Sequence, residues 1–267
     1  MKKKAMTYAQ DINTLASFLG PRDLHALTKK ELQQKYGITQ ADVFVLFGGS
    51  ILSGADVFAQ AKKNEIARHY IIVGGHGHTT DVLRQKVREE YPDIPVKDCP
   101  EAEIFNAYLQ KKYQIQADFL ECNSTNCGNN ITYLLKLLEE NQIDASSIIL
   151  CQDSSMQLRM MAGMKKYRPD LTIINYAAYQ AVVREEKGTF VYEKPIHGMW
   201  KMDQYLTLLM GEIPRLTDDE NGYGPNGKGY IAHVEIPVKV RNAYEHLKEN
   251  YGNHIRKANP EYASGKE

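Results

Sequence analysis

The sequence lacks a surplus of charge of either sign. Its 267 residues contain 33 lysines and arginines and 33 aspartates and glutamates. Nucleic-acid-binding domains usually carry a strongly basic face or a basic overall balance. Long acidic runs, which are typical of solvating tails, are also missing. We therefore expect a small-molecule ligand and no nucleic-acid partner.

Cysteine is scarce, and long apolar runs are missing. The four cysteines show none of the spacings of zinc sites, so we predict reduced thiols and no metal centre. No segment is long and apolar enough to cross a bilayer. The basic start at Met1–Lys4 is followed by polar residues and not by the apolar stretch of a signal peptide. The sequence therefore predicts a cytoplasmic protein without a transmembrane segment.

Glycine-rich turns are present, but the fingerprints of common cofactors are not. Neither Gly48-Gly49-Ser50 nor Gly74-Gly75-His76-Gly77 fits G-x-G-x-x-G, so a nicotinamide cofactor is not supported. Gly222–Lys228 approaches a phosphate-binding P-loop, but Gly229 stands where that motif needs serine or threonine. The glycine-rich turns therefore do not identify a cofactor, and the cofactor is unknown.

Apolar runs of strand length alternate with helical patterns through the middle of the chain. The expected strands are Val43–Phe47, Tyr70–Val73, Asp118–Glu121, Ser147–Asp153 and Leu171–Asn175. Continuous apolar runs are typical of parallel strands that are buried on both faces, and such strands are joined by right-handed crossovers. The sequence predicts an α/β fold with a Rossmann-like doubly wound parallel sheet over residues 39–180.

The chain on either side of this core is expected to form additions. Residues 1–38 are predicted to be a helical N-terminal segment, in which Gly20-Pro21 ends one helix and Gly37 ends a second. Thr28-Lys-Lys-Glu31 has the spacing of a capping box and is expected to start the second helix. From residue 181 to 267 the pattern becomes irregular, and we expect a C-terminal extension packed on the core.

The predicted ligand site is centred on Glu121–Asn130. A strand is expected to end at the first of these residues, and Ile131–Glu139 has leucines at helical spacing. Between them Ser124, Thr125 and Asn126 all favour the N-cap position. The N–H groups and dipole of a helix N-terminus suit phosphate, carboxylate or sugar oxygens. The alternative, that one of the three only caps the helix, stays open.

Three charged residues near other predicted strand ends extend this site. Glu101 opens a helix, where it either complements the helix dipole or faces the same crevice as Glu121 and forms a carboxylate pair with it. Asp153 ends a predicted strand. Arg159 lies in the helix that follows, where it is either a surface residue or an anion-binding residue.

Several of these residues also form the pattern of a known family. Through Ser124-Thr-Asn126 and Asn130 the chain resembles the uncharacterised bacterial domain family that includes SanA, ElyC and YdcF. Its C-terminal blocks, Gly198-Met-Trp200, Gly211–Arg215 and Gly222–Pro225, resemble the YdcF-like branch, and this similarity spans nearly the whole chain. The resemblance implies a Rossmann-like sheet with a ligand site at the strand ends, and it implies S-adenosylmethionine as the best candidate ligand.

The chain departs from the family pattern at two positions. Asn129 stands where most members have glutamate, and Met156 stands where most have histidine. The missing histidine argues against hydrolytic chemistry. The residues that match the pattern by position are Gly48, Gly74, Gly75, Glu101, Glu121, Ser124, Thr125, Asn126, Asn130 and Arg159.

From these observations we predict a site at the carboxyl ends of the strands. Its candidate catalytic residues are Glu121 and Glu101. Its candidate ligand-binding residues are Gly48, Gly49, Ser50, Gly74, Gly75, Ser124, Thr125, Asn126, Asn130, Asp153 and Arg159.

Three functions remain open, and the sequence does not decide whether the protein is an enzyme. The first is binding of a small nucleotide-like or anionic ligand, with S-adenosylmethionine as the best candidate. The second is a hydrolase or transferase that acts on a phosphate- or glycan-linked metabolite of the cell envelope, with Glu121 as base and Arg159 as anion clamp. The third is a non-catalytic interaction protein, which an exposed apolar patch around Trp200 would favour.

Overall fold

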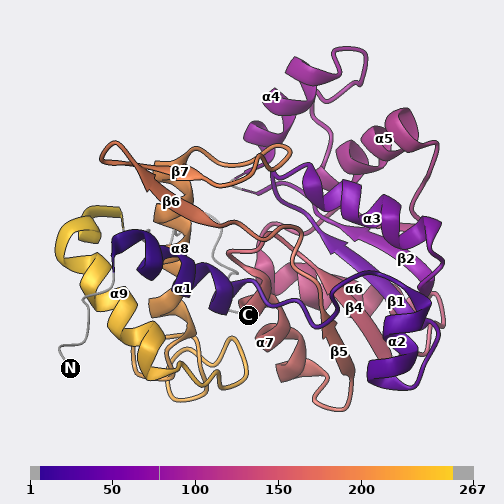
Figure 1. Ribbon diagram of the computed structural model, residues 1–267. Coiled ribbons are helices and arrows are strands. Elements are labelled where there is room, and N and C mark those ends of the chain that lie inside the picture. The colour runs from indigo at the N-terminus through magenta and orange to yellow at the C-terminus, as the bar shows by residue number, and fades with distance from the viewer. Residues whose placement is uncertain (1–6, 78, 255–267) are drawn as a thin grey trace.

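The structure, a computed structural model, describes residues 7–77 and 79–254 (Figure 1). Met1–Lys4 and the last residues of the predicted C-terminal extension lie outside these ranges. No helix in the described part of the chain has the length and apolar content needed to cross a membrane.

Five parallel strands form the central sheet. They are β1 (Ala41–Phe47), β2 (Ala67–Val73), β3 (Phe119–Glu121), β4 (Ser147–Cys151) and β5 (Thr172–Asn175), in the spatial order β3-β2-β1-β4-β5. Chain order reverses between β1 and β4, which is the place where doubly wound sheets bind ligands, outside the carboxyl ends of the strands. The predicted fold class, a Rossmann-like doubly wound α/β sheet, is confirmed.

Helices cover both faces of this sheet. They are α3 (Ser53–Lys63), α5 (Glu101–Tyr113), α6 (Cys127–Glu140) and α7 (Gln157–Tyr167), while α4 (Thr80–Glu90) packs against α5. Successive side chains of a strand point to opposite faces. Accordingly Val43, Val45 and Phe47 share a core with α6 and α7, whereas Phe44 and Leu46 share one with α3 and α5. Each face of β1 is therefore fully buried, as its unbroken apolar sequence predicts.

The N-terminal helices follow the predicted signals. Helix α1 (Tyr8–Leu19) ends at Gly20, and α2 (Lys29–Tyr36) ends at Gly37, whose φ of 72° lies in the left-handed region that favours glycine. The Thr28 hydroxyl accepts the Glu31 N–H, so Thr28 is the N-cap. Only this half of the predicted capping box forms, because the Glu31 carboxylate accepts the N–H of His25 instead.

The C-terminal extension contains the hairpin β6 (Val183–Glu186) and β7 (Thr189–Tyr192), the helices α8 (Met202–Leu216) and α9 (Val238–Tyr251), and the short 3-10 helix η1 (Gly252–His254). Helix α1 packs against α9, β6 and α8 (Figure 1). The Asn13 side chain exchanges two hydrogen bonds with the backbone of Val183, at 2.7 and 2.8 Å. The two ends of the chain thus form one layer beside the sheet, which the sequence did not indicate.

The loop that approaches a P-loop in sequence is closed by its own hydrogen bonds. The Asp218 carboxylate accepts the Asn226 N–H at 2.6 Å, and Asp219 accepts the N–H groups of Asn221 and Gly222 at 3.0 Å. This arrangement explains the acidic and glycine residues of the loop without a phosphate ligand.

Candidate functional site

The ends of strands β3, β2 and β1 lie side by side at the carboxyl edge of the sheet. The Gly48 N–H donates to Val73 O at 2.6 Å, and the Gly74 N–H donates to Glu121 O at 2.9 Å. A Cβ atom added to Gly74 would lie 3.0 Å from Gly48 Cα. Glycine at both positions lets two strand ends and the Glu101 side chain meet in one place.

Glu101 lies against these glycines as the first residue of α5. Its carboxylate accepts hydrogen bonds from the hydroxyls of Thr80 (2.8 Å) and Thr79 (3.2 Å) through Oε1. Burial raises the pKa of Glu101 to about 7, while these hydrogen bonds and the charge of Arg84 act in the opposite direction. Glu101 can therefore hold or release a proton near neutral pH. The structure places it at the same edge of the sheet as Glu121, and the pairing of the two carboxylates stays a prediction.

Glu121 is the last residue of β3 and is buried. Its Oε1 atom accepts the backbone N–H groups of Asn123 (2.6 Å) and Ser124 (3.1 Å), which fixes the carboxylate over the turn that follows. The other oxygen, Oε2, is buried without a hydrogen-bond partner among the described residues. The Ser124 hydroxyl accepts the Gly75 N–H at 3.2 Å and ties this turn to the end of β2.

Gly75 is a close-contact position, and its substitution tests this arrangement. A Cβ atom there would overlap the carbonyl oxygen of Ser124 and lie 2.7 Å from that of Cys122. Because both obstacles are backbone atoms, we expect Gly75→Ala to lower the free energy of unfolding by about 1–3 kcal/mol, measured by urea denaturation.

Gly49→Ala is the matched control, since the nearest atom to its added Cβ would be Gln152 Oε1 at 3.7 Å. Equal stability of the two variants would show that the β2 and β3 ends do not pack as described.

The polar turn before α6 caps that helix. Asn126 is the N-cap residue, and its side-chain oxygen accepts the Asn129 N–H at 3.0 Å. The Asn129 side-chain oxygen accepts hydrogen bonds from Asn126 Nδ2 (2.8 Å) and from the Thr125 hydroxyl (3.1 Å). Capping is thus observed for Asn126. Thr125 is exposed and Asn130 is partly buried in the first turn of α6, and ligand binding by either stays a prediction.

The loops after β1 and β4 carry two more buried polar atoms. Ser50 Oγ and Gln152 Nε2 both lack hydrogen-bond partners within the described chain. Gln152 Oε1 accepts the Asp153 N–H at 2.6 Å, so the amide end of Gln152 is held in place. A cavity of about 10 Å³ lies beside Gly49, Gln152 and Asp153. Gln152 was not among the predicted site residues, although its position at a strand end was a usable signal.

Asp153 is bound by several protein groups. Its carboxylate accepts hydrogen bonds from the hydroxyls of Ser155 and Tyr179, both at 2.7 Å, and from Trp200 Nε1 at 2.9 Å. Trp200 is only 8% exposed, so it forms no exposed apolar patch. These contacts make Asp153 an anchor for the C-terminal extension, and ligand binding by Asp153 stays a prediction.

Arg159 forms an ion pair with the protein itself. Its guanidinium donates to both carboxylate oxygens of Glu212 in α8, at 2.5 and 3.0 Å. The side chains are 13% and 3% exposed, respectively. The residue predicted to clamp a ligand anion therefore already neutralises a buried carboxylate.

Helix α4 brings two cationic side chains to the strand ends, and neither was predicted from the sequence. Arg84 donates to the carbonyl oxygen of Cys99 at 2.8 Å, and its buried Nε has no partner in the described structure. Lys86 donates to Ser50 O at 3.0 Å and to Gly198 O. Burial lowers the pKa of Lys86, and the charge of Asp153 opposes this shift. Nothing in the local sequence distinguishes these residues from ordinary surface cations.

No protein-family model matches the chain. Membership of the SanA/ElyC/YdcF family therefore remains a proposal that depends on the motif residues around Ser124 and in the C-terminal blocks.

Proposed function

We propose that the protein binds a small polar molecule at the carboxyl ends of β1–β4, with S-adenosylmethionine as the first candidate. The observation that supports this most is a set of buried polar atoms without partners among the described residues: Ser50 Oγ, Gln152 Nε2 and Glu121 Oε2. Buried polar groups in proteins are nearly always hydrogen-bonded, and an orphaned one requires an explanation. Three on one sheet edge are consistent with atoms that bind a ligand.

The chemistry of these atoms favours a particular kind of ligand. An ionised Glu121 is only a hydrogen-bond acceptor, so it suits hydroxyl or ammonium groups, while Gln152 Nε2 is a donor that suits a carboxylate or carbonyl oxygen. Neighbouring strands lie about 4.8 Å apart, so the row from β3 to β4 spans about 14 Å. An amino-acid-bearing nucleoside has this length and both kinds of group. A purely anionic ligand fits less well, because Arg159 is engaged with Glu212.

Glu101 gives specific support to the second candidate, a hydrolase or transferase acting on a phosphate- or glycan-linked envelope metabolite. A buried carboxyl group with a pKa of about 7 is suited to general acid catalysis near neutral pH. In this alternative Glu101 would donate the proton and Glu121 would act as base. The third candidate, an interaction protein, loses the feature that would have favoured it, because Trp200 is buried.

Calorimetric titration tests the proposal directly. Purified protein is titrated with S-adenosylmethionine, adenosine, AMP and a UDP-sugar. We expect binding of the adenosyl ligand, and we expect Glu121→Gln to weaken it roughly tenfold or more, since a hydrogen bond to a charged group is lost.

Glu103→Gln is the matched control, because Glu103 is an exposed glutamate of the neighbouring helix α5. Affinity in this variant should equal that of the wild type. Failure of the whole panel to bind, or equal weakening by both substitutions, would contradict the proposal.

A further inference from the structure

Access to the strand ends requires part of the structure to move. The cavity at the β1–β4 boundary has a volume of about 10 Å³, whereas sites for small ligands usually measure about 300–1,000 Å³. The segments that cover this edge must therefore separate before a nucleoside-sized molecule can reach Glu121 or Gln152.

Helix α4 buries few of its own residues. Among its residues only Thr80, Leu83 and Val87 are buried, and the helix stands out from the body of the molecule in Figure 1. At its first turn the Thr80 hydroxyl binds the Glu101 carboxylate. The helix therefore touches the strand-end region at Glu101. Its apolar contact is small, so polar contacts contribute much of what holds it there.

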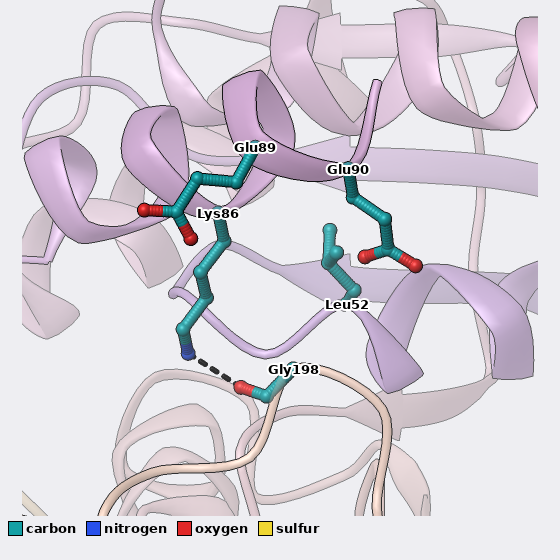
Figure 2. Close-up of a pocket in the computed structure, with 5 residues that line it drawn as sticks. All are labelled: Leu52, Lys86, Glu89, Glu90 and Gly198. Atoms are coloured by element: carbon teal, nitrogen blue, oxygen red, sulfur yellow. Dashed lines mark hydrogen bonds between the residues drawn. The ribbon is translucent and has the colours of Figure 1, made fainter. Parts of the chain in front are cut away.

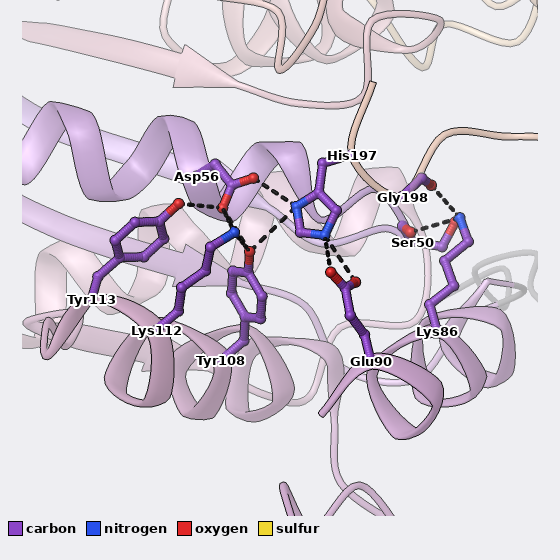
Figure 3. A network of polar contacts seen from close by, with 9 residues as sticks. All are labelled: Ser50, Asp56, Lys86, Glu90, Tyr108, Lys112, Tyr113, His197 and Gly198. Carbon is purple, nitrogen blue, oxygen red and sulfur yellow. Dashed lines mark hydrogen bonds and ion pairs between the residues drawn. The ribbon is translucent and has the colours of Figure 1, made fainter. Parts of the chain in front are cut away.

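The first polar contact is made by Lys86. Its ammonium group donates to the carbonyl oxygen of Gly198 (Figure 2) and to that of Ser50 (Figure 3). It also lies 4.9 Å from the ring centroid of Trp200. A cleft of about 300 Å³ runs along this seam and is lined by Leu52, Lys86, Glu89, Glu90 and Gly198. Lys86 thus joins α4 to the loop after β1 and to the C-terminal extension across an existing gap.

The second contact is made by Glu90 at the end of α4. Both of its carboxylate oxygens lie 2.9 Å from His197 Nε2, while His197 Nδ1 lies 2.8 Å from Asp56 Oδ2 of α3 (Figure 3). Ionised carboxylates only accept hydrogen bonds, and a neutral imidazole has one N–H. Both contacts therefore form together only when His197 carries a proton on each nitrogen.

The other groups around His197 determine which contact is lost. The Asp56 carboxylate also accepts hydrogen bonds from Tyr108 and Tyr113, both at 2.6 Å, and from Lys112 at 3.1 Å. Burial raises the pKa of Asp56, but the hydrogen bonds from Tyr108, Tyr113, His197 and Lys112 outweigh it and lower the pKa overall. The Tyr108 hydroxyl lies 3.4 Å from His197 Nδ1. Asp56 is thus a fixed anion that keeps the Nδ1 proton, and Glu90 faces a lone pair when His197 is neutral.

We propose that α4 is a lid over the strand-end site and that the Glu90–His197–Asp56 contact is a latch, which deprotonation of His197 releases. The lid's purpose depends on the proposed ligand site, but the latch itself does not. Below the transition His197 bridges Asp56 and Glu90 and the lid stays closed. Above it the neutral ring keeps only Asp56, and α4 loses the Glu90 contact while the polar contacts of Lys86, Thr80 and Arg84 remain, so the site opens more often.

Hydrogen–deuterium exchange without ligand tests the latch between about pH 5 and about pH 8, where histidines change charge. Exchange of α4 amides is compared with that of α5 amides in the same sample, so that the intrinsic effect of pH cancels. Loss of a charge-assisted hydrogen bond is expected to speed α4 exchange relative to α5 roughly tenfold or more at high pH. The sole tryptophan, Trp200, lies beneath Lys86 and should become more accessible to acrylamide in parallel.

Two variants separate His197 from other titrating groups. Glu90→Gln replaces the carboxylate with an amide that can donate to the neutral ring, so α4 should stay protected at high pH. His197→Gln removes the charged imidazolium ring, whose two nitrogens donate to Asp56 and Glu90 at the same time. In this variant α4 should therefore exchange fast at every pH. Glu101→Gln should keep the wild-type response, as should His25→Gln, a control at an exposed histidine.

A wild-type α4 that exchanges independently of pH would overturn the latch, as would a response that vanishes in Glu101→Gln. Stopped-flow mixing with S-adenosylmethionine then tests the lid: association should be faster at high pH in the wild type and independent of pH in Glu90→Gln. An association rate that does not follow α4 exchange would overturn the lid. A working latch in a protein that binds no adenosyl ligand would instead count against the proposed function alone.

Discussion

Glu212→Gln is expected to lower the free energy of unfolding by about 3–5 kcal/mol. Glu212 and Arg159 form a bidentate ion pair between α8 and α7, and their side chains are only 3% and 13% exposed. Removing one charge leaves the other buried without compensation, and this penalty exceeds the attraction that the pair itself provides. Urea denaturation followed by circular dichroism measures the change.

A double variant and a surface variant serve as controls for Glu212→Gln. The double variant Arg159→Met and Glu212→Leu should recover much of the lost stability, because apolar residues of similar volume often replace a buried pair at little cost. Glu65→Gln, which breaks the exposed ion pair of Glu65 with Lys29, should cause no detectable change. If Glu212→Gln unfolds at the same urea concentration as Glu65→Gln, the ion pair with Arg159 does not stabilise the fold as described.

Asp153→Ala is expected to destabilise the protein by about 3 kcal/mol or more, because it leaves buried donors without an acceptor, at about 1–3 kcal/mol each. The donors are Trp200 Nε1 and the hydroxyls of Tyr179 and Ser155. Two of them belong to the segment after β5, so the extension should loosen from the core. Thermal and urea denaturation measure the loss, and Trp200 fluorescence reports where it occurs.

A double-mutant cycle separates this anchoring role from the predicted ligand-binding role. Trp200→Phe removes one donor, so its cost and that of Asp153→Ala should add to more than the cost of the double variant. Asp144→Ala, at an exposed aspartate, controls for loss of charge. An Asp153→Ala protein of wild-type stability that no longer binds S-adenosylmethionine would show that Asp153 serves the ligand instead.

The sheet could be predicted because its determinants are local. Val43–Phe47 and Tyr70–Val73 are continuous apolar runs, and each ends in glycines at the carboxyl edge. A continuous apolar strand must bury both of its faces, and a parallel sheet covered by helices provides this burial. The sequence pattern and the structure therefore agree. The ends of α1 and α2 could be predicted from Gly20 and Gly37 for the same reason. Where a helix ends depends on the residues at and next to its last turn.

The partners of polar side chains could not be predicted in this way. Arg159 appears next to a strand end in sequence, but its charge is used by Glu212, which is 53 residues away. Asp153 was expected to face a ligand, and the partners that it has in the structure, Trp200 and Tyr179, could not be read from its neighbours in sequence. Arg84 and Lys86 were overlooked because a buried polar atom is identified by what surrounds it, and those surroundings come from distant segments.

The sequence by itself determined the parallel sheet, its glycine turns and the edge at which the strand-end polar residues gather, because spacing and apolar pattern act over a few residues. Only the tertiary structure decided that α1 packs with the C-terminal extension, that Glu101 is buried against Gly48 and Gly74, and that α4 is held by Lys86 and His197. Ion pairs, burial and pKa shifts depend on atoms brought together by folding, and no local pattern encodes them.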